Sequence, residues 1–576
     1  MTRRLWLAGP ALVLAVALVW TLPPRPDALP EGYVPAGHVR GVVHIHTRRS
    51  DGGGTVDDVA RAAARAGLRF VVVTDHGDGT RPPDPPAYRH GVLVIDAVEV
   101  TTFDGHVVAL GIGEAPYRLG GRGEDVVDDI NRLGGFAIAA HVDSPKRSLR
   151  WRAWDADLAG FEWLNGDSEW RDESRASLLP LLVQYPLRAP EALARVLDRP
   201  EVTLARWDGQ LSTRRLITIP AADAHARVGG SEEDDPRWWR RLALPIPGYE
   251  PLFKAFSLVT TGVELTGQAE ADAAAVLRAI RAGHGYSVVD ALASHSWLRV
   301  EATGSGLAAG PGDALRVADG ASVRIGVRVP DVPGVRIRVM KDGIAVRQAN
   351  GAALDVDLPP GTTGAYRVEV DRAGAPGQPP VPWILSNPIF VGRDEAWGRL
   401  PVPPAPEVRD ARVLVSRDWA GERSERSAVA IDHVRVPAGD AALVRFALSG
   451  TPSSGPFAAA AMPVDGVRGV DAVRLTLRAS RPMRVSVELR GRTPGGEDGR
   501  WRRSVYVDTE SRTAVVPFDT LRPASANQPP LPEAGSVRSL MLVVDGVNSA
   551  PGEAGQIWIE SAALAVRPEP SGPNRQ

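Results

Sequence analysis

The sequence predicts a multidomain protein in which an α/β half is followed by an all-β half. The chain has 576 residues, which is too long for a single hydrophobic core. Up to about residue 295, short apolar runs alternate with segments of helical periodicity, which is typical of a parallel sheet, closed or doubly wound. From residue 296 the helical period disappears. Short alternating runs between Gly-, Pro- and Asp-rich turns then predict β-sandwiches.

In the first half, apolar runs predict strands and amphipathic runs predict helices. The first expected helix, residues 55–66, has Thr55 as a candidate N-cap and Asp58 three residues later. The other expected helices are residues 124–133, the region 176–197 and residues 271–282. The expected strands are residues 42–45, 70–74, 92–100, 107–112, 136–140, 161–164 and 216–220.

The second half contains only strand-like segments. These are residues 323–329, 335–339, 366–370, 473–477, 485–489, 540–544 and 557–559. The Pro-rich stretch 400–407 predicts a linker, which divides this half into two β domains. The expected plan is a signal segment 1–30, an α/β domain 31–295, a β-sandwich 296–393, a linker 394–410, a second β domain 411–567 and a tail 568–576.

The composition removes several classes of site. There is no cysteine, so disulfides, thiolate zinc sites and Cys nucleophiles are excluded, and His and carboxylates must hold any metal. The net charge is −2, so no basic field attracts a nucleic-acid polymer. No G-x-S-x-G motif is present, so a serine triad of the α/β-hydrolase type has no support.

The N-terminus predicts export. Arg3 and Arg4 precede an uncharged apolar run, residues 5–22, and then a Pro-rich stretch, residues 23–30. The run is about as long as the roughly 17–25 residues of a membrane-spanning helix. A cleaved signal peptide and an uncleaved signal anchor both fit this pattern. Either one places the chain in the periplasm or at the cell surface, with the membrane contacted only through the N-terminal segment.

Histidine is the most informative residue type, because ten of the eleven histidines precede residue 296. They fall near the ends of expected strands, close to carboxylates. The clusters are His44, His46 and Asp51; Asp75 and His76; Glu99 and His106; His141; and Asp223 and His225. Because residues i and i+2 of a strand point to one face, His44 and His46 can reach the same ion. Each cluster alone is more often structural, but their recurrence at successive strand ends predicts a metal site.

The order of these residues resembles the PHP (polymerase and histidinol phosphatase) family. The pattern is His-x-His-x-x-x-Ser-Asp-Gly, Thr-Asp-His, a strand-end Glu, Ala-His and Asp-Ala-His, over residues 38–290. The resemblance implies a distorted (β/α)7 barrel with a trinuclear site and phosphoesterase activity. The ligand sets it implies are His44, His46, Glu99 and Asp223; Glu99, His106 and His141; and Asp51, His76 and His225. The Ala-His-Val-Asp-Ser-Pro and Ala-Ala-Asp-Ala-His segments depart from the family's Ala-His-Pro and Ser-Asp-Ala-His.

The implied chemistry needs two to three divalent ions and no protein nucleophile. Two ions bridged by Glu99 lower the pKa of a shared water, and the resulting hydroxide attacks a phosphate mono- or diester. Mixed His and carboxylate ligands suit Zn, Mn or Fe. Candidate substrate-binding cations are Arg48, Lys146, Arg147 and Arg227, each of which follows a ligand position closely. The expected substrate is a phosphorylated small molecule or an envelope-derived compound.

The C-terminal half adds a second expectation about partners. Residues 383–391 resemble the end of a β module, of Ig-like type, that is appended to long PHP proteins. The last domain resembles a galactose-binding-like jelly roll. Trp419, Trp501 and Trp558 are candidates for binding a glycan, with core packing as the alternative. Two other functions stay open for the whole chain, namely a metal-dependent hydrolase of a non-phosphate bond and a non-catalytic envelope protein that binds through its β domains.

Overall fold

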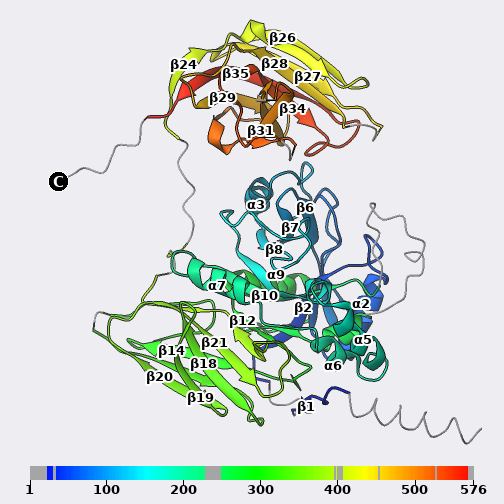
Figure 1. Cartoon of the computed structure of the whole chain (residues 1–576), viewed down its shortest axis with the longest axis vertical. Helices are drawn as coiled ribbons and strands as arrows, with labels where there is room; N and C mark the ends of the chain where they lie inside the picture. The colour runs from blue at the N-terminus through cyan, green and yellow to red at the C-terminus, as the bar shows by residue number, and fades with distance from the viewer. Residues whose placement is uncertain are drawn as a thin grey trace, which may run out of the picture. The chain divides into compact units, whose positions relative to one another are not determined.

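The computed structural model describes residues 22–29, 34–227, 248–318, 320–394, 397–398, 406–451, 455–493, 495–525 and 528–568. The chain forms two compact units (Figure 1). Unit 1 comprises Met1–Gly113 and Arg122–Leu400, and unit 2 comprises Glu114–Gly121 and Pro401–Gln576. Much of the expected signal segment, linker and tail lies outside the described residues. In the described part of the chain we find no helix that is long and apolar enough to cross a membrane.

The first part of unit 1 is a mixed sheet. Its strands are β2 (Val39–Ile45), β3 (Phe70–Val73), β4 (Ala87–Arg89), β5 (Val92–Asp96), β6 (Val98–Thr102), β7 (Gly105–Leu110), β8 (Phe136–Ala139), β9 (Gly160–Asn165), β10 (Ile217–Ala224), β11 (Ser257–Thr260) and β12 (Gly285–Val288). β8, β9, β10, β2, β3 and β5 pair in parallel in that order. Every apolar run that was expected to be a strand is confirmed, with residues 92–100 divided between β5 and β6.

The expected fold class, a distorted (β/α)7 barrel, is wrong. Such a barrel needs a helix between successive parallel strands, whereas β5, β6 and β7 follow one another without a helix. β6 and β7 form an antiparallel hairpin, and β7–β8, β11–β2 and β11–β12 are also antiparallel. The sheet then continues from β12 into β22 of the following β segment. Unit 1 is therefore a predominantly β structure, closed by strands from both sides of residue 296.

Short helices fill several of the connections between the strands of unit 1. The helices are α2 (Val56–Arg65), α3 (Gly123–Arg132), α4 (Gly166–Arg171), α5 (Arg175–Gln184), α6 (Ala189–Ala194), α7 (Glu201–Gln210), α8 (Tyr249–Phe253) and α9 (Ala269–Ala282). The capping box of α2 is confirmed, because Asp58 N donates to Thr55 Oγ1 (3.2 Å) and Thr55 N donates to Asp58 Oδ2 (2.9 Å). The expected helical region 176–197 contains α5 and α6, whereas α4, α7 and α8 were not expected.

The second part of unit 1 is all β and shares its core with the first part. Its strands are β13 (Ala293–Ser294), β14 (Arg299–Gly304), β15 (Leu307–Ala309), β16 (Ala314–Leu315), β17 (Val323–Arg328), β18 (Val335–Lys341), β19 (Ile344–Asn350), β20 (Ala353–Leu358), β21 (Gly364–Arg372), β22 (Ile384–Ser386) and β23 (Ile389–Val391). Tyr286 and Val288 of β12 pack in the same apolar cluster as Val327 and Val368. This β segment is thus joined to the first part by a shared sheet and lies in the same compact unit.

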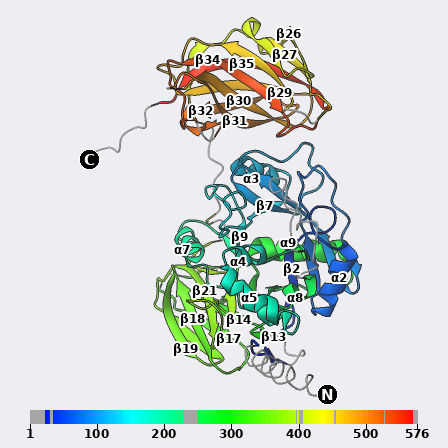
Figure 2. The same cartoon turned by 45° about the vertical axis from the view of Figure 1, so that its right-hand side comes forward.

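Unit 2 is a β-sandwich. Its strands are β24 (Arg409–Val413), β25 (Ala420–Arg423), β26 (Ala428–Val436), β27 (Gly439–Ala447), β28 (Phe457–Pro463), β29 (Ala472–Ala479), β30 (Met483–Arg492), β31 (Asp498–Val507), β32 (Arg512–Pro517), β33 (Arg522–Pro523), β34 (Val537–Asp545) and β35 (Ala554–Val566). They form two six-stranded sheets, which Figure 2 shows one over the other. Alternating apolar side chains of both sheets fill the space between them, as expected for a sandwich.

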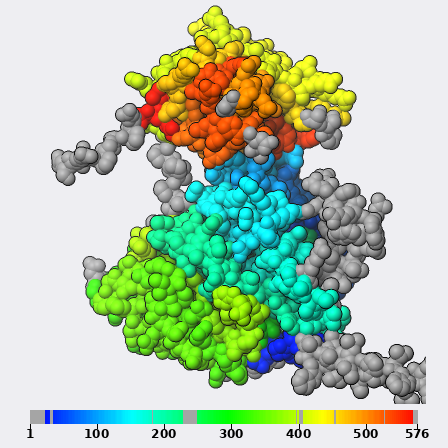
Figure 3. All heavy atoms as spheres, in the orientation of Figure 1, coloured from blue at the N-terminus to red at the C-terminus, as the bar shows by residue number. Residues whose placement is uncertain are grey.

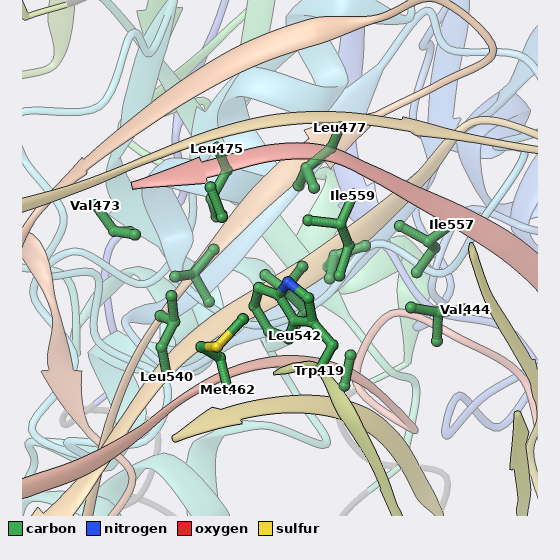
Figure 4. Packing of buried hydrophobic residues seen from close by; sticks show 14 of the residues in the cluster. Trp419, Val444, Met462, Val473, Leu475, Leu477, Leu540, Leu542, Ile557 and Ile559 are labelled. Carbon is green, nitrogen blue, oxygen red and sulfur yellow. The ribbon is translucent and has the colours of Figure 1, made fainter. Parts of the chain in front are cut away.

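Two of the three tryptophans considered for glycan binding belong to this core. Trp419 lies among Met462, Leu542 and Ile559 (Figure 4). Trp501 is fully buried, and its indole N–H donates to the carbonyl of Pro529 (2.8 Å). These two side chains therefore stabilise the sandwich and offer no surface for a sugar ring.

Candidate metal centre

The structure brings together all nine residues that were expected to bind metal. Their ligand atoms form four overlapping groups, and within each group the atoms lie within 4.8 Å of one another. The groups are His44, His46 and Asp223; His44, Glu99 and His141; His76, Glu99 and His106; and His46, Asp51, His76 and His225. Because the groups share members, they form one continuous cluster of imidazole and carboxylate ligands.

Strand ends position most of these side chains. His44 and Asp223 lie within the last residues of β2 and β10, and His46 and His225 follow directly. His76 follows β3 and forms a bridge with Glu99 of β6. His106 begins β7, and His141 comes two residues after β8. The ligands therefore come from six strands that meet at one end of the sheet.

Glu99 occupies the centre of the cluster. Its Oε1 accepts hydrogen bonds from His106 Nδ1 (2.8 Å) and His141 Nε2 (3.2 Å). Its Oε2 lies 3.1 Å from His44 Nε2 and 3.2 Å from His46 Nε2. One buried carboxylate thus faces two groups of histidines, which is the geometry of a bridging ligand.

Asp51 and its neighbours form the open side of the cluster. Asp51 Oδ2 lies 3.1 Å from His225 Nε2 and 3.6 Å from His76 Nε2. The side chains of Asp51 and His225 are each 22% exposed and that of His76 is 34% exposed, whereas those of His44, His46 and Glu99 are fully buried. Solvent can therefore reach the cluster through this group.

Left-handed backbone at three ligand positions directs side chains into the cluster. His44, His141 and Asp223 have φ angles of 68°, 52° and 46°. A non-glycine residue in this region costs about 1–3 kcal/mol, and such strain concentrates at functional sites. The expectation that His44 and His46 converge through regular strand alternation is wrong, because His44 departs from strand geometry and His46 lies beyond β2. Their rings nevertheless lie only 5.1 Å apart between centroids.

Unpaired buried atoms test whether these residues fit a metal ion. Among the described residues, His44 Nε2, His46 Nε2, Glu99 Oε2 and both carboxylate oxygens of Asp223 are buried without a hydrogen-bond partner. These atoms lie 3.1–3.4 Å from one another or from His141 Nδ1, as charge contacts without a hydrogen bond. All five atoms belong to residues of the overlapping groups described above. Divalent cations would satisfy them together, and imidazole with carboxylate ligands suits Zn, Mn or Fe.

The ionisation of the cluster also favours a cation. Burial lowers the pKa of His44, but Glu162, Asp223 and Glu99 outweigh it and raise this pKa well above its usual value. Burial likewise lowers the pKa of His141, yet Asp223 and Glu99 raise it to about 9. Burial raises the pKa of Glu99, whereas His44, His106 and His76 hold it well below the usual value. Buried carboxylates that retain negative charge attract protons or metal ions.

Glu162, a buried carboxylate of β9, was not among the site residues expected from the sequence. Its Oε1 accepts a hydrogen bond from His44 Nδ1 (2.5 Å), and its Oε2 accepts from His141 N (3.0 Å) and Asn165 Nδ2 (2.7 Å). Glu162 therefore orients one ligand by its ring and another by its backbone. A charged residue within the otherwise apolar strand Gly160–Asn165 was the signal that could have identified it.

Two further aspartates, Asp75 and Asp167, lie next to the cluster and make different contacts. Asp75 accepts hydrogen bonds from Thr47 N (2.7 Å), Thr47 Oγ1 (2.6 Å) and Ser50 Oγ (2.7 Å), so it holds the turn that leads to Asp51. Asp167 forms a further group with His141 and Asp223. Its oxygens also bind Arg171 and the indole N–H of Trp170.

The four expected substrate-binding cations lie in two places. Arg48 Nε donates to the carbonyl of Gly53 (2.8 Å), and Gly53 N donates to the carbonyl of His225 (2.7 Å). Arg227 is half-buried, and its Nε has no hydrogen-bond partner among the described residues. Both arginines therefore lie near the open group. Lys146 and Arg147 lie in the loop after His141, where Lys146 is half-buried and Arg147 is exposed.

Comparison with known proteins assigns no family. No protein-family model and no curated protein matches the chain. A family 11 carbohydrate-binding module from Clostridium thermocellum, in complex with a β-1,3-1,4-mixed-linked tetrasaccharide, is 14% identical over 27% of this chain and 96% of its own, with a TM-score of 0.23. The mannan-recognising module TmCBM27 is 13% identical over 28% of this chain and 99% of its own, with a TM-score of 0.20. Neither a family nor a function follows from similarity at this level.

Proposed function

We propose that unit 1 is an exported, metal-dependent hydrolase that cleaves phosphate mono- or diesters. The observation that supports this proposal most directly is the set of five buried ligand atoms that lack a hydrogen-bond partner, at the centre of six histidines and three carboxylates. A structural core would pair or remove such atoms, because each one destabilises the fold. Polar groups that stay buried and unpaired favour a function that uses them.

The proposed site would hold two to three divalent ions. His44, His46, Glu99 and Asp223 would hold one, Glu99, His106 and His141 a second, and Asp51, His76 and His225 a third. Ions held there would supply the positive charge and the activation of water that phosphoester hydrolysis requires. Glu99 would fix the spacing of the first two ions, because its two oxygens face different histidines.

The chain's own cations would bind the substrate at the open side. Guanidinium groups bind phosphate oxygens through charge-assisted hydrogen bonds. Arg48 and Arg227 lie beside Asp51 and His225, where the cluster reaches solvent. We therefore expect the phosphoryl group to lie between these arginines and the open group.

The experiment measures metal content and hydrolysis together. The purified full chain would be analysed for bound metal and assayed on p-nitrophenyl phosphate and bis(p-nitrophenyl) phosphate. Glu99→Gln should lose both metal and activity, because it removes the shared carboxylate charge. His284→Ala is the matched control, since His284 pairs with Asp313 (2.9 Å) at the surface and belongs to none of the ligand groups described.

Other outcomes separate the remaining alternatives. A chain that binds metal but cleaves only a non-phosphate ester or an amide would be a hydrolase of another bond. A chain that binds no metal, cleaves neither phosphate ester and is retained on a polysaccharide gel would be a non-catalytic envelope protein. Either result would overturn the phosphoesterase proposal.

A further inference from the structure

Helix α5 carries an apolar stripe that faces solvent. Leu179, Val183 and Leu187 are 63%, 48% and 55% exposed, and Ala176 and Pro180 are exposed as well. Positions 176, 179, 180 and 183 follow helical spacing, so these side chains lie on one face of α5, and Leu187 lies in the turn after the helix ends at Gln184. The helical part of the stripe is about 10 Å long, at about 1.5 Å per residue.

The opposite side of α5 is also largely apolar. Leu178 and Leu181 are half-buried, and Gln184 is buried against the rest of unit 1. Residues 176–187 contain no charged side chain. A helix that is apolar on nearly every side is normally enclosed by protein or lipid, because an apolar outer face is unfavourable in water. The exposed stripe of α5 therefore requires a partner.

The chain itself indicates which partner this is. The apolar run 5–22 ends immediately before Pro23, and the carbonyl of Pro23 accepts a hydrogen bond from the guanidinium of Arg188. Arg188 follows Leu187, the last residue of the stripe. Both Figure 1 and Figure 2 place this part of unit 1 beside the N-terminal strand β1 (Asp27–Ala28). In Figure 3 the dark-blue N-terminal residues lie on the surface next to the blue-green part of unit 1.

The segment that follows the N-terminal run is held on unit 1 by β1. β1 pairs with β13, and Asp27 forms an ion pair with Arg372. An apolar run that spans a bilayer ends at the polar headgroup layer, which is roughly 5–8 Å thick on each side. Pro23 follows the run directly and is hydrogen-bonded to Arg188, so a run that spans a bilayer would bring the stripe close to that layer.

We propose that α5 is a second membrane contact, which rests its apolar stripe on a phospholipid surface next to the N-terminal run. Such a contact would orient unit 1 on the membrane, whereas a single spanning segment would leave it free to rotate. This proposal depends on the N-terminal run and not on the hydrolase function, so either one can fail without the other.

The absence of cysteine permits a direct test. In the full chain reconstituted into phosphatidylethanolamine–phosphatidylglycerol vesicles, Leu179→Cys would carry a single environment-sensitive fluorophore. Ile344→Cys is the matched control, because Ile344 of β19 is an apolar side chain of unit 1 that is 72% exposed. We expect nitroxide lipids to quench the label at position 179 several-fold more than the label at position 344. Iodide in the aqueous phase should show the opposite preference.

Three outcomes would overturn the proposal. Equal quenching of both labels by nitroxide lipid would mean that α5 has no special membrane contact. A label at position 179 that iodide quenches fully would mean that the stripe stays in water. Protection of that label from both quenchers would mean that protein covers the stripe, either another segment of this chain or a second copy.

Discussion

His44 and Glu162 form a fully buried pair in which the imidazole Nδ1 lies 2.5 Å from the carboxylate Oε1. An ionised carboxylate can only accept, so Nδ1 carries a proton, and Nε2 is the atom at which a metal ion would take the place of a proton. Glu162 thereby selects the tautomer of His44 that can bind a metal. It acts as a positioning residue, because it does not itself belong to the ligand groups.

We expect Glu162→Gln to weaken metal binding by about 10–100-fold, the usual effect of removing a carboxylate behind a histidine ligand. The amide keeps the size of the side chain but loses its charge, and it cannot accept at both oxygens. Competition with a fluorescent chelator measures the affinity. Glu301→Gln is the control, because Glu301 is an exposed carboxylate of β14. An unchanged affinity in Glu162→Gln would show that Glu162 has only a packing role.

Removal of metal should make the thermal stability of the protein decrease as the pH becomes alkaline. In the metal-free protein, burial opposes the charge of His141, but Asp223 and Glu99 raise its pKa from 6.5 to about 9. Protonated His141 pairs with these carboxylates, and this pairing stabilises the fold fully below pH 6.5. The stabilisation is lost as the pH rises through about 9, where His141 loses its proton. We expect the Tm of chelator-treated protein to fall across this window. The Tm of metal-loaded protein should fall less over the same pH range, because bound ions take the place of the protons on the histidines.

A separate group of carboxylates should give a pH dependence at lower pH. Burial, followed by Asp198, Glu173 and Asp143, raises the pKa of Asp172 to about 6. Protonated Asp172 makes its full contribution to the stability of the fold below about pH 4. This contribution is lost as the pH rises through about 6, where the carboxyl group ionises. Asp172→Asn should therefore raise the Tm at pH 8 and leave it unchanged at pH 4. Asp155→Asn, at an exposed turn, is the control and should shift neither value.

The stability of the contact between the two parts of unit 1 should depend on one buried ion pair. Arg367 of β21 donates to Asp208 of α7 through Nε and Nη2, both at 2.8 Å, and it also binds Glu369. Removing one partner from such a network costs about 3–5 kcal/mol, because the remaining charges stay buried. We expect Arg367→Met to lower the free energy of unfolding by this amount in urea titrations.

The matched control for Arg367 is an exposed pair in the same unit. Arg324 Nε lies 2.7 Å from Asp357 Oδ1, and both side chains are mostly exposed. Water screens this pair, so Arg324→Met should have little effect on unfolding. Equal effects of the two substitutions would contradict a special role of the buried network.

The sequence predicted individual elements better than their arrangement. The apolar runs of β2, β3 and β8 are strands, and the capping box of α2 is present. Alternation of strands and helices predicted a parallel sheet, and the family resemblance implied a barrel, but an apolar run does not reveal the direction of its neighbour. The hairpin of β6 and β7 turns at Gly105, whose φ of 110° suits glycine, and a Cβ there would lie 2.5 Å from the carbonyl of Arg150.

The candidate site could be predicted from the sequence because its residues carry unusual chemistry at strand ends. The cluster of His44, His46 and Asp51 is ambiguous alone, but the recurrence of such clusters along the chain is informative. Glu162 was missed because one carboxylate in a strand carries no spacing pattern, and its role depends on a contact 118 residues away. The left-handed backbone of His141 and Asp223 also could not be predicted, because it is imposed by tertiary contacts.

The spread of the ligands along the chain has a kinetic consequence. The nine residues extend from His44 to His225 and meet only when the strands that carry them have paired. Loops of this length close late, so the cluster cannot exist in an early folding intermediate. Any ion that binds there would recognise the native state alone, and would slow unfolding without accelerating folding. Metal availability would then govern how long the folded protein persists, and not how quickly it forms.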